Sequence, residues 1–197
     1  TGTVAVVVSG EPPTWNYMTV GFAEGLKAAN PEAKMLYSVI GEAAYDDAAG
    51  AKRVTEQQLA ADADVIFGMG DGASFGMIQA IEEHNAQDGA NRAWFIDVIG
   101  DKKAEHGDVL LSSVLFDYSG IYRQMVDDLT AGTFGDIYTM DIKNGGVRLL
   151  ELPEDLAQEA KDAVSEAEQK IVDGSLTVSA ISDAEEMKAK IAELFPQ

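Results

Sequence analysis

The residues best placed to do chemistry lie in a glycine-rich segment near residue 70. Gly72-Ala-Ser74-Phe-Gly76 has the G-x-S-x-G pattern that presents a serine nucleophile in hydrolases when it follows a strand and opens a helix. Asp97 or Asp101, and then His106, follow in the chain order serine, aspartate, histidine. The pattern therefore allows a serine hydrolase with Ser74 as nucleophile and His106 as general base.

Other features of this segment favour ligand binding over catalysis. Glycine-rich residues separate Ser74 from its strand, no HGGG-type segment precedes it, and His106 lies in a polar stretch typical of an exposed turn. A serine at such a position more commonly caps or opens a helix. The spacing of Gly70, Gly72 and Gly76 does not fit the G-x-G-x-x-G dinucleotide fingerprint. The glycines still allow the backbone to approach a ligand, toward which the first amides of the helix would point.

Two further groups could contribute to a binding site. Phe75 would project near the mouth of this cleft, or alternatively pack into the core. Residues 143–146 combine Lys143 and Asn144 with two glycines, so they can hold an amine and an amide in place, although a plain hairpin turn has the same composition. The two histidines show no ligand spacing typical of a metal site, and no cofactor is expected.

An alternation of apolar strands and amphipathic helices would position these groups. Short apolar runs predict strands over residues 3–8, 34–40, 64–67, 94–99 and 109–112. Helical spacing predicts helices over residues 15–29 and 46–61, and a third after the glycine-rich segment. This alternation indicates a parallel sheet with helices on both faces. Ligands of such sheets bind beyond the carboxyl ends of the strands, where the glycine-rich segment lies.

The pattern is less regular in the second half of the chain. It predicts a helix over residues 118–131, a strand over 136–142 and another over 147–150. An acidic helix from Pro153 to Gly174, a strand over 176–178 and a helix over 183–194 would complete the fold.

Composition narrows the function classes. The 197 residues are 46% hydrophobic, and no stretch holds the roughly 18 consecutive apolar residues of a membrane span. Fourteen basic and 34 acidic residues give a net charge of −20, which argues against nucleic-acid binding and indicates a solvated surface of the kind that salt adaptation favours. The absence of cysteine excludes disulfides and thiolate metal sites.

Several segments, taken in order, carry a family resemblance. They are Pro13-x-Trp15-x-x-Met18-x-x-Gly21-Phe22-x-x-Gly25, Asn30-Pro31, Tyr45-Asp46-Asp47 with Lys52, Ala63-Asp64-Val65-Ile66-Phe67, VLLSS at residues 109–113, Gly132-x-Phe134, and Ile142-Lys143-Asn144-Gly145-Gly146-Val147. Together they resemble the basic membrane protein (BMP/Med) family of lipoproteins, which includes purine-nucleoside receptors. Gly50 and Ala51 depart from the family's K-G, and Val98-Ile99-Gly100-Asp101 keeps only the second acid of its V-D-x-D segment.

The resemblance implies a type I periplasmic-binding-protein lobe, a flavodoxin-like α/β sandwich of three layers. In that fold two lobes close on a ligand at a hinge. The implied function is the solute-binding component of an ABC importer, which captures a nucleoside or similar small molecule and delivers it to the permease without chemistry. The protein would be extracytoplasmic, either periplasmic or anchored as a lipoprotein. A ligand-sensing module of a signalling receptor is the alternative within the same binding class.

The resemblance also implies a division of the chain. The export signal, the lipid-anchored cysteine and the first lobe are not in the sequence, so we expect the second lobe and tail of a longer protein. Residues 1–113 would form the second ligand-binding lobe. Residues 114–140 would be a crossover segment that packs on the missing first lobe, and residues 141–197 a return segment with the C-terminal helices.

The resemblance assigns binding residues one by one. Lys143 matches a lysine implied to contact ribose, and Asn144 lies beside it. Phe75 and residues 70–74 fall where the second lobe would meet the base. Asp101 retains the second acid of V-D-x-D, and Asp97 is expected to substitute for the first. The predicted ligand-binding residues are therefore Gly70, Asp71, Ser74, Phe75, Asp97, Asp101, Lys143 and Asn144.

Overall fold

Strands and helices alternate through the first half of the chain, as the sequence pattern predicts. The structure is a computed structural model and describes residues 1–196. Its strands are β1 (Thr3–Val8), β2 (Lys34–Val39), β3 (Ala63–Met69), β4 (Trp94–Ile99), β5 (Leu110–Phe116) and β6 (Val147–Leu149). Its helices are α1 (Pro13–Ala29), α2 (Ala48–Ala60), the 3-10 turn η1 (Asp71–Ala73), α3 (Ser74–Asn85), α4 (Lys103–His106), α5 (Ser119–Ala131), α6 (Gln158–Asp173) and α7 (Ala184–Leu194).

The sheet is mostly parallel, with strand order β2-β1-β3-β4-β5-β6. β1 pairs in parallel with β2 and β3, and β3 pairs in parallel with β4, whereas β5 and β6 are antiparallel. Every residue of β1 is buried, which explains why its sequence is a continuous apolar run. The predicted α/β class is confirmed. Because the strand order reverses between β1 and β3, this class of sheet places its ligand crevice outside the carboxyl ends of these two strands.

The chain forms two compact units. The first contains Thr1–Asp97, Lys102–Leu111 and the described residues from Val178 onward, and the second contains Val98–Asp101 and Ser112–Thr177. The last helix, α7, therefore belongs with the first unit, whereas the sequence pattern groups it with residues 141–177.

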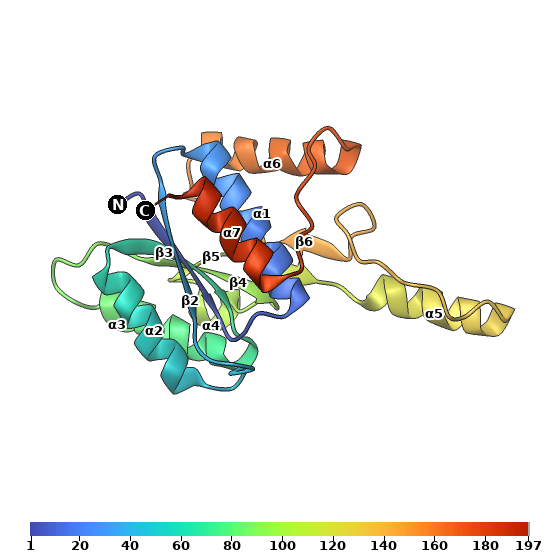
Figure 1. Cartoon of the computed structure of the whole chain (residues 1–197), viewed down its shortest axis with the longest axis horizontal. Helices are drawn as coiled ribbons and strands as arrows, with labels where there is room; N and C mark the ends of the chain where they lie inside the picture. The colour runs from blue at the N-terminus through green and yellow to red at the C-terminus, as the bar shows by residue number, and fades with distance from the viewer. Residues whose placement is uncertain (197) are drawn as a thin grey trace. The chain divides into compact units, whose positions relative to one another are not determined.

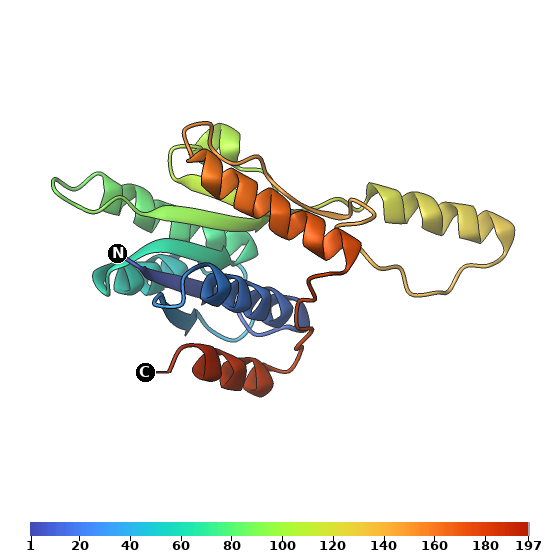
Figure 2. The same ribbon diagram turned by 90° about the horizontal axis from the view of Figure 1, so that it is seen from above.

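In the first unit, α1 and α7 lie side by side on one face of the strands, and α2 and α3 lie on the other (Figures 1 and 2). The side chain of Met187 in α7 is fully buried. The Asn16 side-chain amide donates a hydrogen bond to the carbonyl of Ser182 at 2.7 Å, just before α7. The Lys188 ammonium pairs with Glu11 at 3.0 Å, in the loop that follows β1. These contacts fix the C-terminal helix to the element that follows the first strand.

The second half of the chain departs from the sequence prediction at three places. Residues 136–142 and 176–178 do not form strands, and the acidic helix α6 begins at Gln158 instead of Pro153. In the first of these segments, side-chain hydrogen bonds take the place of strand pairing. The Asn144 side chain accepts from the Asp141 amide at 3.1 Å and donates to the Thr139 carbonyl at 2.8 Å. The backbone amide and carbonyl groups that strand pairing would need are thus hydrogen-bonded to a side chain within a turn.

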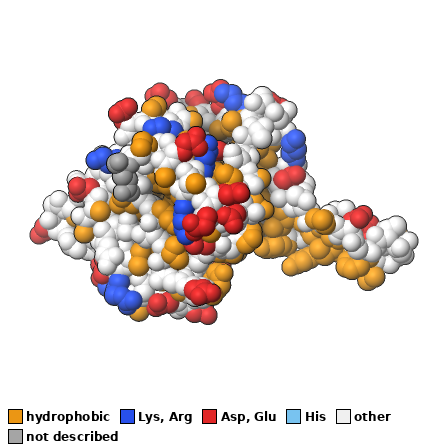
Figure 3. Space-filling view, viewed as in Figure 1, with side chains coloured by type: hydrophobic (Ala, Val, Ile, Leu, Met, Phe, Trp, Pro, Cys, Tyr) orange, Lys and Arg blue, Asp and Glu red, His pale blue; other side chains and the backbone are white. Residues whose placement is uncertain are grey.

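Helix α5, in the same unit, has no buried residue. Its large apolar side chains Tyr122, Val126 and Leu129 are each at least 60% exposed. They recur at a spacing of four and three residues, which places them on one face of the helix. Figure 3 shows apolar side chains gathered along this helix. An apolar helix face of this kind is typical of a surface that packs against another protein segment.

The acidic composition predicts stability that depends on salt. With a net charge of −20, self-repulsion destabilises the folded chain, and salt screens that repulsion. Raising NaCl from about 0.1 M to about 1 M shortens the Debye length from about 10 Å to about 3 Å. We expect Tm, measured by circular dichroism, to rise by at least about 4 °C over this range. A glycerol series of matched osmolality is the control, and an equal rise there would contradict the screening explanation.

Candidate functional site

Backbone strain accumulates at the carboxyl ends of the parallel strands. Three of the four non-glycine residues with positive φ in residues 1–196 lie in these places: Ala43 (51°) after β2, Asp71 (51°) after β3 and Ile99 (73°) at the end of β4. The fourth, Asp62 (65°), lies just before β3. Positive φ is rare for side chains with a Cβ, and for a β-branched residue such as Ile99 it is an outlier. Strain of this kind persists where the surrounding structure enforces it, and it clusters at ligand sites. The strain therefore coincides with the edge that the strand order marks for a ligand.

The glycine-rich loop is held closely by the loop that precedes α2. The Ala73 amide donates a hydrogen bond to the Tyr45 carbonyl at 2.7 Å. A Cβ on Gly72 would lie 2.7 Å from Oδ1 of Asp46, so only glycine fits there without a shift. The sequence predicts that the first amides of α3 point at a ligand, but the amide of Ser74, the first residue of α3, already donates to the carbonyls of Asp71 and Gly72. The loop is a packed support more than an open anion site.

Ser74 is the first residue of α3, and its side chain neither caps the helix nor faces solvent. The residue is 1% exposed, and its Oγ has no hydrogen-bond partner among residues 1–196. Nδ1 of His106 instead lies 2.9 Å from Oε1 of Glu82. The structure thus does not bring together the serine and histidine of the hydrolase hypothesis. Of the two helix roles predicted for Ser74, the structure bears out that it opens α3, whereas no side chain caps this helix.

Phe75 is the most exposed apolar group of this edge, at 53% of its surface. The alternative that it packs into the core is therefore wrong. The Lys102 ammonium lies over its ring, 5.6 Å from the centroid. The ring of His106 approaches it edge-on, with centroids 6.2 Å apart. The remaining exposed surface of the ring is available to stack on a flat ligand.

Asp97 and Lys102 form a charged pair beneath and beside Phe75. Asp97 in β4 is completely buried, and its Oδ2 forms an ion pair with the Lys102 ammonium. The Lys102 side chain is only 19% exposed. The sequence predicts Asp97 as a ligand-contacting acid, but the structure places it behind Lys102. Asp101, the other predicted acid, is exposed and belongs to the second unit.

Sequence reasoning missed Lys102. The stretch of residues 102–107 has the composition of an exposed turn, whereas in the structure it contains the short helix α4. The one signal that could have identified Lys102 is its place in the loop at the carboxyl end of β4. Loops there carry ligand contacts in parallel sheets.

The carboxyl of Asp71 is electrostatically unusual. Partial burial raises the pKa of Asp71, the nearby Asp46 carboxylate raises it further, and the Lys102 ammonium opposes both. Asp71 is the exposed residue of the Gly70-to-Ser74 turn, so its carboxylate is accessible to a ligand at this edge. A partly desolvated carboxylate is a strong acceptor for hydroxyl groups.

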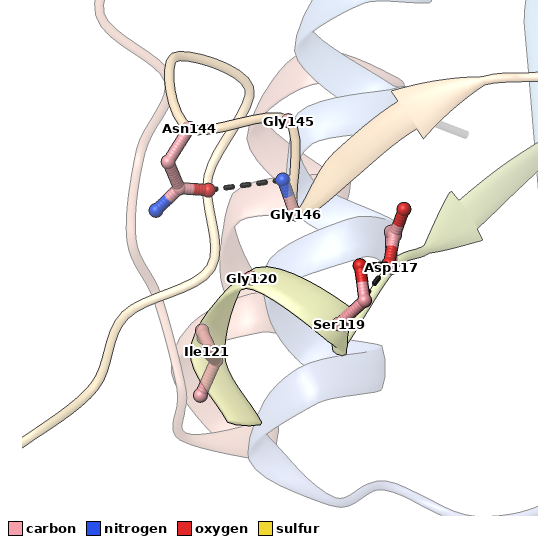
Figure 4. A pocket seen from close by; sticks show the side chains of 7 residues that line it. All are labelled: Asp117, Ser119, Gly120, Ile121, Asn144, Gly145 and Gly146. Atoms are coloured by element: carbon pink, nitrogen blue, oxygen red, sulfur yellow. Dashed lines mark hydrogen bonds between the residues drawn. The ribbon is translucent and has the colours of Figure 1, made fainter. Parts of the chain in front are cut away.

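The second unit contains the predicted turn of residues 143–146, of which Figure 4 shows Asn144, Gly145 and Gly146. The Asn144 side-chain oxygen accepts from the Gly146 amide at 2.9 Å, in addition to its contacts with residues 139 and 141, so its amide holds the turn. Lys143 is exposed and lies close enough to Asp173 to lower the pKa of that carboxyl, after the larger effect of hydrogen bonds from Ser175. A cavity of about 140 Å³ is lined by Asp117, Ser119, Gly120, Ile121, Asn144, Gly145 and Gly146. It is smaller than the roughly 300–1,000 Å³ of typical small-molecule sites.

Within residues 1–196, no group of three or more His, Cys, Asp or Glu side chains could hold a metal ion. Over the same residues, no helix has both the length and the apolar character needed to cross a membrane.

Known proteins resemble this chain in sequence. It is 27% identical over 170 residues to the ABC transporter nucleoside-binding protein BmpA of Lactococcus lactis subsp. cremoris (strain MG1363). The alignment covers 80% of this chain and 47% of that protein. The chain therefore spans about half the length of this curated relative.

Solved structures share the fold. An ABC transporter solute-binding protein from Aeropyrum pernix K1 superposes with a TM-score of 0.80 at 21% identity, over 98% of this chain and 64% of that one. A transcriptional activator of the comK gene from Bacillus halodurans superposes with a TM-score of 0.75 at 22% identity, over 91% of this chain and 59% of that one. At these identities the likeness establishes the fold alone.

The family match covers most of the chain. Residues 1–182 match the Bmp family, described as ABC transporter substrate-binding protein PnrA-like. This agrees with the motifs, the mostly parallel sheet and the solved relatives. The chain belongs to the Bmp family of PnrA-like ABC transporter substrate-binding proteins.

Proposed function

We propose that the protein containing this chain captures a nucleoside, or a related small polar ligand, for an ABC importer without changing it chemically. The observation that carries the proposal is the half-exposed ring of Phe75 at the carboxyl ends of the parallel strands. Membership of the substrate-binding family supports the class of function. The name of the Lactococcus relative supports a nucleoside over other solutes.

The proposed mechanism is capture by stacking and hydrogen bonding. A base stacked on an aromatic side chain gains about 1–3 kcal/mol. The Asp71 carboxylate would contact the ligand next to Phe75, and the buried residues Gly70 and Ser74 would support the loop that carries it. Asp101, Lys143 and Asn144 are proposed as further contacts on the resemblance alone. Closure of two lobes on the ligand would then distinguish the loaded protein from the empty one for the permease.

We further infer that the exposed apolar face of α5 packs against a first lobe in the longer protein. The exposed apolar side chains Tyr122, Val126 and Leu129 lie within residues 114–140, the proposed crossover to a first lobe. The chain spans 47% of its curated relative, which leaves ample length for such a lobe. In this proposal residues 1–113 form the second lobe and residues 141–197 return to it. An extracytoplasmic protein, anchored as a lipoprotein or periplasmic, is the location that fits this role.

The proposal is tested by a thermal-shift screen of nucleosides, bases and sugars on the full-length protein. A ligand present at 100 times its Kd stabilises the folded state by about 2.7 kcal/mol, which is readily measured. We expect nucleosides to raise Tm more than free bases or free ribose, because only they engage both the ring and the polar groups. No shift with any nucleoside would contradict the proposal. Labelling of Ser74 by a fluorophosphonate probe would favour the hydrolase instead.

Lys143 provides a second, independent prediction. Lys143→Ala should weaken nucleoside binding at least about tenfold, the loss typical of a charge-assisted hydrogen bond. The fold should remain intact, because Lys143 is exposed. Lys190→Ala is the matched charge control, because Lys190 is a partly exposed lysine of α7 that pairs only with Glu193, at 3.3 Å, in the described contacts. Isothermal titration calorimetry with unchanged affinity would remove Lys143 from the site.

A further inference from the structure

The Phe75 ring is held on two sides although it is half exposed. The Lys102 ammonium lies over one face, 5.6 Å from the ring centroid. His106 touches the ring edge-on, and His106 is itself oriented by Glu82 through the 2.9 Å contact of its Nδ1. An exposed phenylalanine in the first turn of a helix would otherwise sample several rotamers.

The side chain of Lys102 is itself held in place by Asp97. Its ammonium pairs with Asp97, a fully buried carboxylate of β4, and four-fifths of its side chain is covered. A surface lysine that remains over a ring loses much of the conformational entropy of its side chain. A weak cation–π contact alone would not offset this loss. The buried Asp97 carboxylate supplies the additional attraction that holds the Lys102 side chain in place. Asp97, Lys102 and Phe75 therefore form a continuous support from the sheet to the exposed ring.

We infer that Lys102 is a positioning residue, which orients the Phe75 ring for stacking before the ligand arrives, and that Asp97 serves to anchor Lys102. This inference rests on the proposed function, in which the ring stacks on a nucleobase. It assigns Asp97 a role beneath the site instead of a ligand contact. Because the cation occupies one face of the ring, the base stacks on the surface that remains exposed. Preorganisation of this kind raises affinity by removing the ordering that binding would otherwise require.

The inference is tested with a neutral pair and a conservative variant. Lys102→Met alone would remove the ion pair of the buried Asp97 carboxylate and risk unfolding the protein. The double variant Lys102→Met/Asp97→Asn removes both charges together. Lys102→Arg keeps a cation over the ring and the pair with Asp97. Lys34→Met, at the exposed amino end of β2, repeats the loss of one lysine away from the site.

The measurement is Kd for inosine, or for whichever nucleoside of the screen binds most tightly, on the full-length protein with Phe75 or with Phe75→Leu. With Phe75 present, the neutral pair should weaken binding about three- to tenfold, the loss expected when one side chain must be ordered on binding. In the Phe75→Leu background it should change Kd less than about twofold, because non-additivity reports that two residues act together. Lys102→Arg and Lys34→Met should both stay within about twofold of the unsubstituted protein.

The outcomes separate the inference from the proposed function. An equal loss in both backgrounds would show that Lys102 acts on the fold or on the ligand directly, and would overturn the positioning role. No loss with Phe75 present would overturn it as well. Failure of the unsubstituted protein to bind any nucleoside would overturn the proposed function itself, and the inference with it. Circular dichroism spectra confirm that each variant is folded.

Discussion

Replacement of Phe75 by alanine is expected to weaken nucleoside binding about 5- to 150-fold, since stacking of one base is worth about 1–3 kcal/mol. The ring is 53% exposed and contributes little to the core, so Tm without ligand should change by less than about 2 °C. Calorimetric titration of the full-length protein gives the affinity, and circular dichroism gives the stability.

Two conservative replacements sharpen this prediction. Phe75→Tyr keeps an aromatic face and should retain affinity within about threefold, whereas Phe75→Leu keeps only apolar volume and should lose most of what alanine loses. If leucine and tyrosine behaved alike, the contact with the ligand would be apolar but not stacked. If all three variants bound normally, Phe75 would not be part of the site.

Replacement of Gly76 by alanine is expected to destabilise the protein by about 1–3 kcal/mol, the range of overpacked substitutions. A Cβ at Gly76 would collide with the backbone carbonyl of Ala48, at the start of α2. Backbone atoms cannot rotate away as a side chain can, so α2 and α3 would have to separate. For a protein of this size, Tm should fall by about 3–10 °C in thermal unfolding.

Gly25→Ala is the matched control, because Gly25 also lies inside a helix, α1, but a Cβ there would meet nothing within 4 Å. Alanine is the better helix former by about 0.8–1.0 kcal/mol, so this variant should be neutral or more stable. A loss of stability at Gly25 as large as that at Gly76 would contradict the explanation by close helix packing.

The first five strands were predictable because each is a short apolar run between helices, a pattern that burial on both faces imposes. The same logic failed at residues 136–142. Alternating side chains there suggest a strand, but the Asn144 amide fixes the neighbouring backbone in a turn. Sequence periodicity reports burial, and it carries no information about a competing side-chain hydrogen bond.

The candidate site shows the same limit. The glycine-rich segment and Phe75 were predictable, because parallel sheets bind ligands beyond their strand ends and glycine permits close approach. The burial of Asp97 was not, since it depends on Lys102, five residues later, folding back over it. The packing of Gly72 and Gly76 against the segment before and at the start of α2 was equally hidden. Gly72 and Gly76 therefore permit close packing against that segment more than contact with a ligand.

The attachment of α7 to α1 has a consequence for how the chain reaches its native state. The hydrogen bond from Asn16 to the carbonyl of Ser182 joins groups separated by 166 positions. Contacts so distant along the chain close slowly, and folding rates fall as such contacts predominate. The outer face of α1 therefore stays bare until translation has passed through the whole of the second unit. A nascent chain arrested before residue 184 should remain open to chaperones and proteases at that face, however well its first four strands have already paired.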